Sequence, residues 1–132
     1  MNFREMTQSD LDYVKDNSLS RGILNKQPDV IDFAYTLEDG GRVLGIGGIR
    51  LINMTTAWAW VDLTEIVPAG FFAMQDKLDS LCKEHNIKRL QAYVECDFPK
   101  AIRTIEYLGF ERESVMKNFV DDRDAFLYVR FA

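Results

Sequence analysis

Two carboxylates and the start of a helix stand close together near the middle of the chain. Asp62 and Glu65 lie at the end of an aromatic and β-branched run, residues 56–63, whose imperfect alternation predicts a strand. Residues 69–85 then carry apolar side chains at helical spacing, namely Phe71, Met74, Leu78, Leu81 and Cys82. Carboxylates can accept protons, and the unpaired N–H groups and positive dipole end of a helix start suit a phosphate or another anion. The sequence therefore predicts a ligand site where this strand passes into this helix.

Other residues of types that often carry chemistry have plainer explanations. His85, the only histidine, continues the apolar stripe of the helix, so we expect a structural role for it. Three glycines at 45–48 lie inside a strand pattern with no helix after it, which predicts a bulge or a close backbone contact rather than a nucleotide loop. Trp58 and Trp60 share one strand face and are expected in the core or in the wall of a substrate site.

The composition is that of an ordinary soluble globular protein. The 132 residues are 47% hydrophobic and 28% charged, and 16 Lys and Arg against 21 Asp and Glu give a net charge of -5. This balance argues against nucleic acid as a partner, because phosphate binding favours a basic surface. It fits a cationic amine or a basic protein segment, and solubility alone explains it equally well.

Cysteine usage and the absence of long apolar runs bear on the compartment. Cys82 and Cys96 lack metal-ligand spacing, which predicts reduced thiols in a cytoplasmic protein and no metal site. The first residues lack the apolar core of a signal peptide, and no apolar run has membrane-spanning length. We therefore expect one compact cytoplasmic domain over residues 1–132, with no membrane contact and an oligomeric state left open.

Local patterns predict an α+β fold. Runs of hairpin strands followed by alternating strands and helices indicate a mixed, mostly antiparallel sheet with helices on both faces. The predicted order is a strand at 1–6, a helix from Thr7 with a further turn at 19–25, strands at 31–37, 42–52 and 56–63, a helix at 69–85, a strand at 87–96, a helix capped by Asp97 and ended by Gly109, and strands at 114–120 and 125–131.

Several of these elements have explicit end signals. Thr7 and Asp10 are spaced as a short capping box at a helix start. Residues 39–40, Asp-Gly, predict a two-residue hairpin turn, since both types tolerate positive φ. Gly109 followed by Phe110 predicts a Schellman ending, in which the glycine is left-handed and the phenylalanine folds back on the helix.

Together these features resemble the GNAT superfamily of N-acetyltransferases over nearly the whole chain. The hairpin at 39–45 resembles the family's turn into a glycine-bearing third strand, and the strand-to-helix junction stands where the family places acetyl-CoA. The apolar stripe that closes on Gly109 and Phe110 resembles the family's late-helix ending. Asp124 before an aromatic final strand also fits, and small phage-encoded proteins of GNAT type are similar in length.

The resemblance implies transfer of an acetyl group from acetyl-CoA to a primary amine of a small molecule or a protein. It implies Glu65 as the general base that takes the proton of the amine through water, with Asp62 as a second candidate. A helix-start or solvated structural carboxylate is the alternative for each. The residues implied in holding CoA are Leu63, Thr64, Ala69, Gly70, Phe71 and Phe72 at the junction and Lys100 and Arg103 on the late helix, which otherwise form a solvated face.

Two departures from the family pattern favour a non-catalytic alternative. Phe71 and Phe72 carry bulk where the family's loop has small residues and the backbone approaches a pyrophosphate. The late-helix Tyr that protonates the leaving thiolate in many members is Ile105 here, and Tyr107 lies roughly 200° around the helix. The alternative is a catalytically inactive GNAT-fold protein that binds a protein partner, for example a phage protein acting on a host or virion protein.

Overall fold

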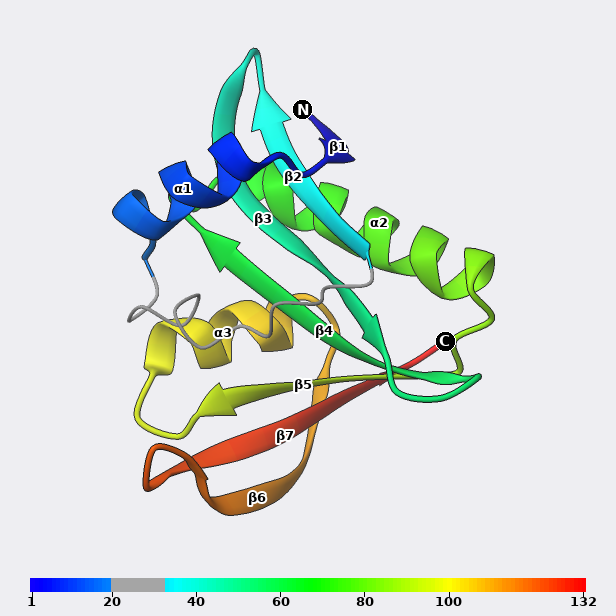
Figure 1. Cartoon of the computed structure of the whole chain (residues 1–132). Coiled ribbons are helices and arrows are strands. Elements are labelled where there is room, and N and C mark those ends of the chain that lie inside the picture. The colour runs from blue at the N-terminus through cyan, green and yellow to red at the C-terminus, as the bar shows by residue number, and fades with distance from the viewer. Residues whose placement is uncertain (20–32) are drawn as a thin grey trace. The chain divides into compact units, whose positions relative to one another are not determined.

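The computed structural model describes residues 1–19 and 33–132 (Figure 1). Its elements are β1 (Asn2–Glu5), α1 (Gln8–Asn17), β2 (Phe33–Asp39), β3 (Arg42–Leu51), β4 (Thr56–Leu63), α2 (Pro68–Glu84), β5 (Arg89–Glu95), α3 (Pro99–Tyr107), β6 (Glu111–Val120) and β7 (Arg123–Phe131). Among the described residues, seven strands form one sheet in the order β1-β2-β3-β4-β5-β7-β6. Strands β4 and β5 run parallel, whereas the pairs β1–β2, β2–β3, β5–β7 and β6–β7 are antiparallel, which confirms the predicted α+β sheet. The helical turn predicted at 19–25 lies, apart from Leu19, outside the described residues.

The contacts of the chain group it into two compact units. The first comprises Met1–Arg50 and Ala59–Lys77, and the second comprises Leu51–Trp58 and Leu78–Ala132. Strand β4 and helix α2 therefore each have residues in both units. The junction between β4 and α2 lies wholly in the first unit.

In the first unit, α1 and α2 pack on opposite faces of the strands. Thr36 donates through Oγ1 to Asp10 on α1 at 2.8 Å. The next residue of β2, Leu37, has its Cδ2 3.4 Å from the position that a Cβ on Gly70 of α2 would occupy. Because successive side chains of a strand point to opposite faces, the two helices cover different faces, as predicted.

The core under α1 is apolar and closely packed. Val14 of α1 and Ile46 of β3 are fully buried against each other. Trp60 packs on this pair, so the core interpretation of this tryptophan is confirmed. Burial of these apolar side chains holds α1 on the sheet.

The start of α1 is tied to β1 and β2 by one buried carboxylate. The predicted capping box is present, since the Asp10 N–H donates to Thr7 Oγ1 at 3.2 Å and the Thr7 N–H donates to Asp10 Oδ2 at 2.9 Å. Arg4 donates to both carboxylate oxygens of Asp10, at 2.7 and 2.9 Å, and its Nε donates to Glu38 at 2.9 Å. The Arg4 guanidinium holds the pKa of Asp10 well below its usual range. This network fixes the start of α1 against β1 and β2 within the first unit.

The turn between β2 and β3 is one residue later than predicted. Asp39 pairs with Arg42 as the last residues of the two strands, so the loop is Gly40–Gly41 and not Asp39–Gly40. Both glycines have positive φ, 57° and 83°. A turn of this type needs positive φ at both central residues, which glycine adopts without the steric cost of a Cβ.

The glycines of β3 confirm the predicted close backbone contacts. A Cβ on Gly45 would lie 2.7 Å from Leu63 Cδ2 and 2.8 Å from the carbonyl oxygen of Asp62. A Cβ on Gly48 would lie 1.9 Å from the carbonyl oxygen of Phe33. The sheet register also shifts at Leu37 and Glu38, which pair with Gly45 and Val43, so the extra residue Leu44 marks a bulge within β3. These glycines therefore serve packing within the sheet.

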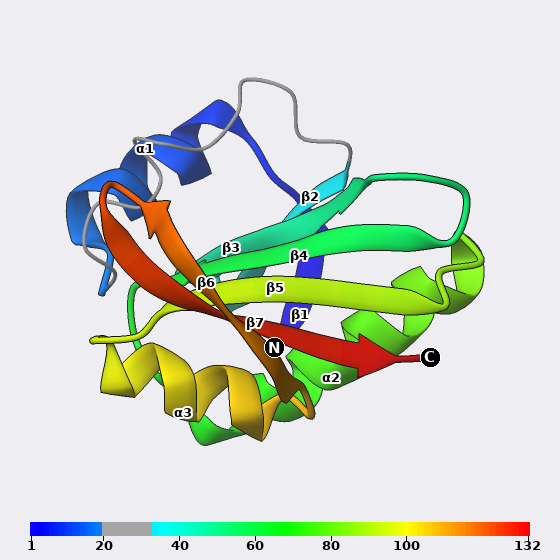
Figure 2. The same cartoon turned by 90° about the horizontal axis from the view of Figure 1, so that it is seen from below.

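In the second unit, α3 lies against β5 and β7 (Figure 2). The buried hydroxyl of Tyr128 on β7 donates to Glu106 on α3 at 2.7 Å and accepts from Arg112 at 3.1 Å. Burial, followed by the Glu106 contact, raises the pKa of Tyr128. These bonds fasten α3 to the sheet.

The two ends of α3 show one correction and one confirmation. The cap residue is Phe98 and not Asp97, because the residue before Pro99 is sterically kept out of the helical region and Phe98 has φ -117° and ψ 79°. The Schellman ending is present: Phe110 N–H donates to the Ile105 carbonyl at 3.3 Å, and Gly109 has φ 90°.

The closing hairpin is tighter than predicted. Val120 pairs with Arg123, so the loop consists of Asp121 and Asp122, with φ 46° and 64°. Strand β6 begins at Glu111, three residues before the predicted start at Ser114. Aspartate tolerates the left-handed region better than most residues, which permits the shorter loop.

Candidate functional site

The predicted passage from strand to helix is present in the first unit. Strand β4 ends at Leu63, and α2 begins at Pro68. The next residue, Thr64, is bonded to β3. Its N–H donates to the Leu44 carbonyl at 2.9 Å, and its Oγ1 donates to the Val43 carbonyl at 3.1 Å. The short connection that follows carries Glu65. The predicted strand-to-helix junction is therefore confirmed, because residues 64–67 form neither part of a continuous helix nor a hairpin turn.

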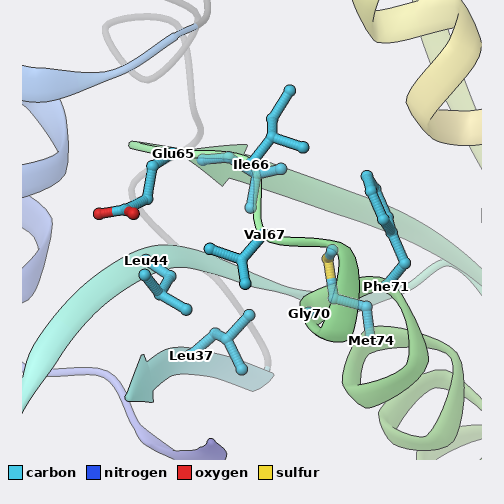
Figure 3. Close-up of a pocket in the computed structure, with 9 residues that line it drawn as sticks. Leu37, Leu44, Glu65, Ile66, Val67, Gly70, Phe71 and Met74 are labelled. Atoms are coloured by element: carbon cyan, nitrogen blue, oxygen red, sulfur yellow. The ribbon is translucent and has the colours of Figure 1, made fainter. Parts of the chain in front are cut away.

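A small apolar pocket lies beside this connection (Figure 3). It has about 10 Å³ available to the centre of a water molecule, which is room for roughly one water. Figure 3 shows Glu65 and Phe71 on opposite sides of it, with Met74 and the two strand leucines between them. Its lining consists of Leu37, Leu44, Leu63, Glu65, Ile66, Val67, Gly70, Phe71 and Met74. The pocket is therefore too small for a substrate. Its lining shows that Glu65 lies next to the start of α2.

Glu65 remains accessible although it has an ionic partner. Its Oε2 lies 3.5 Å from Nε of Arg42, with 41% of the Glu65 side chain and 56% of the Arg42 side chain exposed. Exposed pairs of this kind contribute little stability, so another cation can replace Arg42 at small cost. This pairing could not be predicted from the sequence, because the two residues are far apart along the chain.

Asp62 has a different environment from Glu65. It is 1% exposed and accepts a hydrogen bond from Ser18 Oγ, just beyond the end of α1. Leu63 lines the pocket together with Glu65, and its neighbour Asp62 must therefore point to the other face of the strand. The structure does not bring the two carboxylates together, since Asp62 is buried at Ser18 and Glu65 lies beside the pocket.

The helix start offers less backbone to an anion than the sequence suggested. Pro68 has no N–H, and the N–H of Gly70 donates to the Val67 carbonyl at 2.8 Å. Gly70 is also buried against Leu37, so it faces the sheet. Ala69, the second residue of α2, is small and exposed. An anion would therefore approach the helix at Ala69.

The two phenylalanines of the helix start differ in their placement. Phe71 lines the pocket, whereas the Phe72 side chain is 71% exposed. The two aromatic side chains therefore lie in different environments, one in the pocket lining and one exposed.

The remaining predicted residues lie on α3, in the second unit. Lys100 and Arg103 are exposed on this helix. Ile105 is buried, whereas the Tyr107 side chain is 71% exposed. The buried Ile105 side chain is apolar and cannot transfer a proton.

The described residues contain neither a metal-binding cluster nor a membrane-spanning helix. Within 1–19 and 33–132, no group of three or more His, Cys, Asp and Glu side chains could hold a metal ion. Over the same residues, no helix combines the length and apolar character needed to span a bilayer. Cys82 and Cys96 are free thiols, and burial raises the pKa of the Cys82 thiol.

Similarity to known proteins is found in the structure and not in the sequence. No family model matches the sequence, and neither does any curated protein. The structure is similar to a chimera of the spermidine N-acetyltransferase SpeG from Vibrio cholerae and hSSAT, with a TM-score of 0.76 at 17% identity over 98% of this chain and 94% of that chain. It is similar to Ard1 from Thermoplasma volcanium, with a TM-score of 0.74 at 23% identity over 99% and 97% of the two chains. An acetyltransferase of the GNAT family from Bacillus anthracis gives 0.72 at 17% identity over 98% and 93%. The chain therefore has the fold of the GNAT acetyltransferases.

Proposed function

We propose that this protein is an acetyl-CoA-dependent N-acetyltransferase that acts on a primary amine. The observation that carries the proposal is the GNAT fold over nearly the whole chain, together with an intact β4-to-α2 junction that holds an accessible carboxylate. The net charge of -5 supports a cationic acceptor. That residues 1–132 act as one domain is part of the same proposal.

The residues of the first unit have defined roles in this proposal. Acetyl-CoA would supply the acetyl group, and the reaction forms a C–N bond to the amine while the C–S bond breaks. Ala69 would offer its N–H to the diphosphate, because its place in the first turn leaves it without an acceptor inside the helix. Glu65 would take the proton of the ammonium group directly or through water, and its exposure permits either route. With Ile105 at the late-helix position, the leaving thiolate would take its proton from solvent.

Binding of CoA is the direct test, read as a thermal shift. A ligand specific to the native state at about 100 times its Kd stabilises by roughly 2.7 kcal/mol, on the order of 10 °C for a domain of this size. Ala69→Glu places a negative charge where the diphosphate would bind, while an acidic residue in the first turn favours the helix itself. Ala69→Gln is the matched neutral control.

We expect wild type and Ala69→Gln to be stabilised by CoA and Ala69→Glu to lose most of the shift. A well-folded wild-type sample with no shift at millimolar CoA would reject the enzyme. The inactive, protein-binding alternative would then stand, and the search would move to protein partners.

A further inference from the structure

The residues that follow α1 are bonded to the end of β4. The backbone N–H of Leu19 donates to the carbonyl of Leu63 at 2.8 Å. The hydroxyl of Ser18 donates to the buried carboxylate of Asp62. We call Ser18 and Leu19 the strap. All four residues belong to the first unit, and the end of α1 lies near the arrowhead of β4 (Figure 1).

The direction of the β4 backbone shows which edge the strap occupies. The Thr64 N–H donates to Leu44 on β3, and the carbonyl oxygen of Asp62 approaches Gly45 on β3. Polar groups of successive strand residues point to alternate edges, so residues 62 and 64 face β3 and Leu63 faces the other edge. Leu19 therefore pairs with the edge of β4 that is turned away from β3.

We infer that the strap is an autoinhibitory contact that covers the free edge of β4 and must open when an acyl-CoA binds. The inference rests on the proposed function. A pantetheine arm carries two amides and pairs in an extended form with a strand edge, as a peptide does in β-augmentation. An acceptor at Leu63 that is already bonded to Leu19 is not available to such an arm. The strap and the ligand therefore compete for one carbonyl.

The strap can be removed by a single substitution. Ser18 has φ -61° and ψ 139°, the conformation that a residue before proline prefers. Leu19→Pro therefore deletes the N–H donor without disturbing the preceding residue. Leu19→Ala is the control, because it truncates the half-exposed side chain and keeps the N–H.

The experiment measures CoA affinity by titration calorimetry for wild type, Leu19→Ala and Leu19→Pro. One intramolecular hydrogen bond has a modest net value, so we expect Leu19→Pro to bind CoA roughly two- to ten-fold more tightly than Leu19→Ala. In parallel, NMR exchange should show the Leu19 amide of wild type protected without ligand and exposed at saturating CoA.

Each outcome decides the matter. Tighter binding by Leu19→Pro than by Leu19→Ala, with wild type also binding CoA, supports the strap. Equal or weaker binding by Leu19→Pro, or a Leu19 amide that stays protected in the CoA complex, overturns the strap and leaves the proposed function in place. Absence of CoA binding by the wild-type protein overturns both.

Discussion

Replacement of Asp10 tests how the first unit is held together. Asp10 is 5% exposed and accepts hydrogen bonds from the side chain of Arg4, the N–H of Thr7 and the hydroxyl of Thr36. In Asp10→Asn, the amide can keep the acceptor oxygen towards Thr7 and Thr36, but its NH₂ group must then face a nitrogen of Arg4. The variant therefore loses the paired charge and one arm of the bidentate contact.

The expected loss of stability follows from these contacts. Breaking a buried ion pair costs about 3–5 kcal/mol, and a hydrogen bond to a charged group is worth about 1.5–3 kcal/mol. Arg4 is 35% exposed and keeps Glu38 as a partner, so solvent screening lowers the figure. We expect Asp10→Asn to lower the free energy of unfolding by about 2 kcal/mol at pH 7.

The effect must also depend on pH with a definite sign. The pKa of Asp10 is depressed in the folded protein, so its contribution is complete above the pKa of the unfolded chain, about 4. It declines as the pH falls from there towards the folded pKa. The difference in stability between wild type and Asp10→Asn should therefore be constant from pH 7 to about 5 and narrow at pH 3.

Urea unfolding at pH 7, 5 and 3 measures this difference. Asp12→Asn is the matched control, because Asp12 is an exposed residue of the same helix. Both substitutions change the net charge by the same amount. The control should stay within about 0.5 kcal/mol of wild type. An Asp10→Asn variant as stable as the control, or a difference that does not narrow at pH 3, would refute the buried network.

Two further predictions concern catalysis and the end of α3. Glu65→Gln should keep the thermal shift with CoA and slow acetyl transfer about 10²- to 10⁴-fold, because it removes a proton acceptor and little bulk. Unchanged steady-state rates would remove Glu65 from the mechanism. Gly109→Val should lower stability in urea by at least about 1 kcal/mol, since the residue has φ 90°, whereas Gly109→Asn should cost less. Equal stability of the two variants would contradict a conformational origin.

The sequence by itself determined the elements whose signals are local. Thr7 and Asp10 are three residues apart, and the Gly109–Phe110 ending reaches back only five residues, so their hydrogen bonds could be predicted from spacing. The order of strands and helices followed from apolar periodicity in the same way. Local geometry also explains the errors at Asp39 and Asp97. At the hairpin, the pairing of Asp39 with Arg42 moved the turn by one residue. At α3, the steric effect of Pro99 made Phe98 the cap in place of Asp97.

The tertiary structure decided which side of each element a residue faces. Asp62 and Glu65 are three residues apart, yet Asp62 is buried beside Ser18 whereas Glu65 is half-exposed beside Arg42. Gly70 had the residue type for an anion loop, but it packs on Leu37 instead. These contacts join segments that are distant in sequence, and the choice between faces depends on strand register and helix rotation. A single sequence specifies those only through the packing of the folded chain.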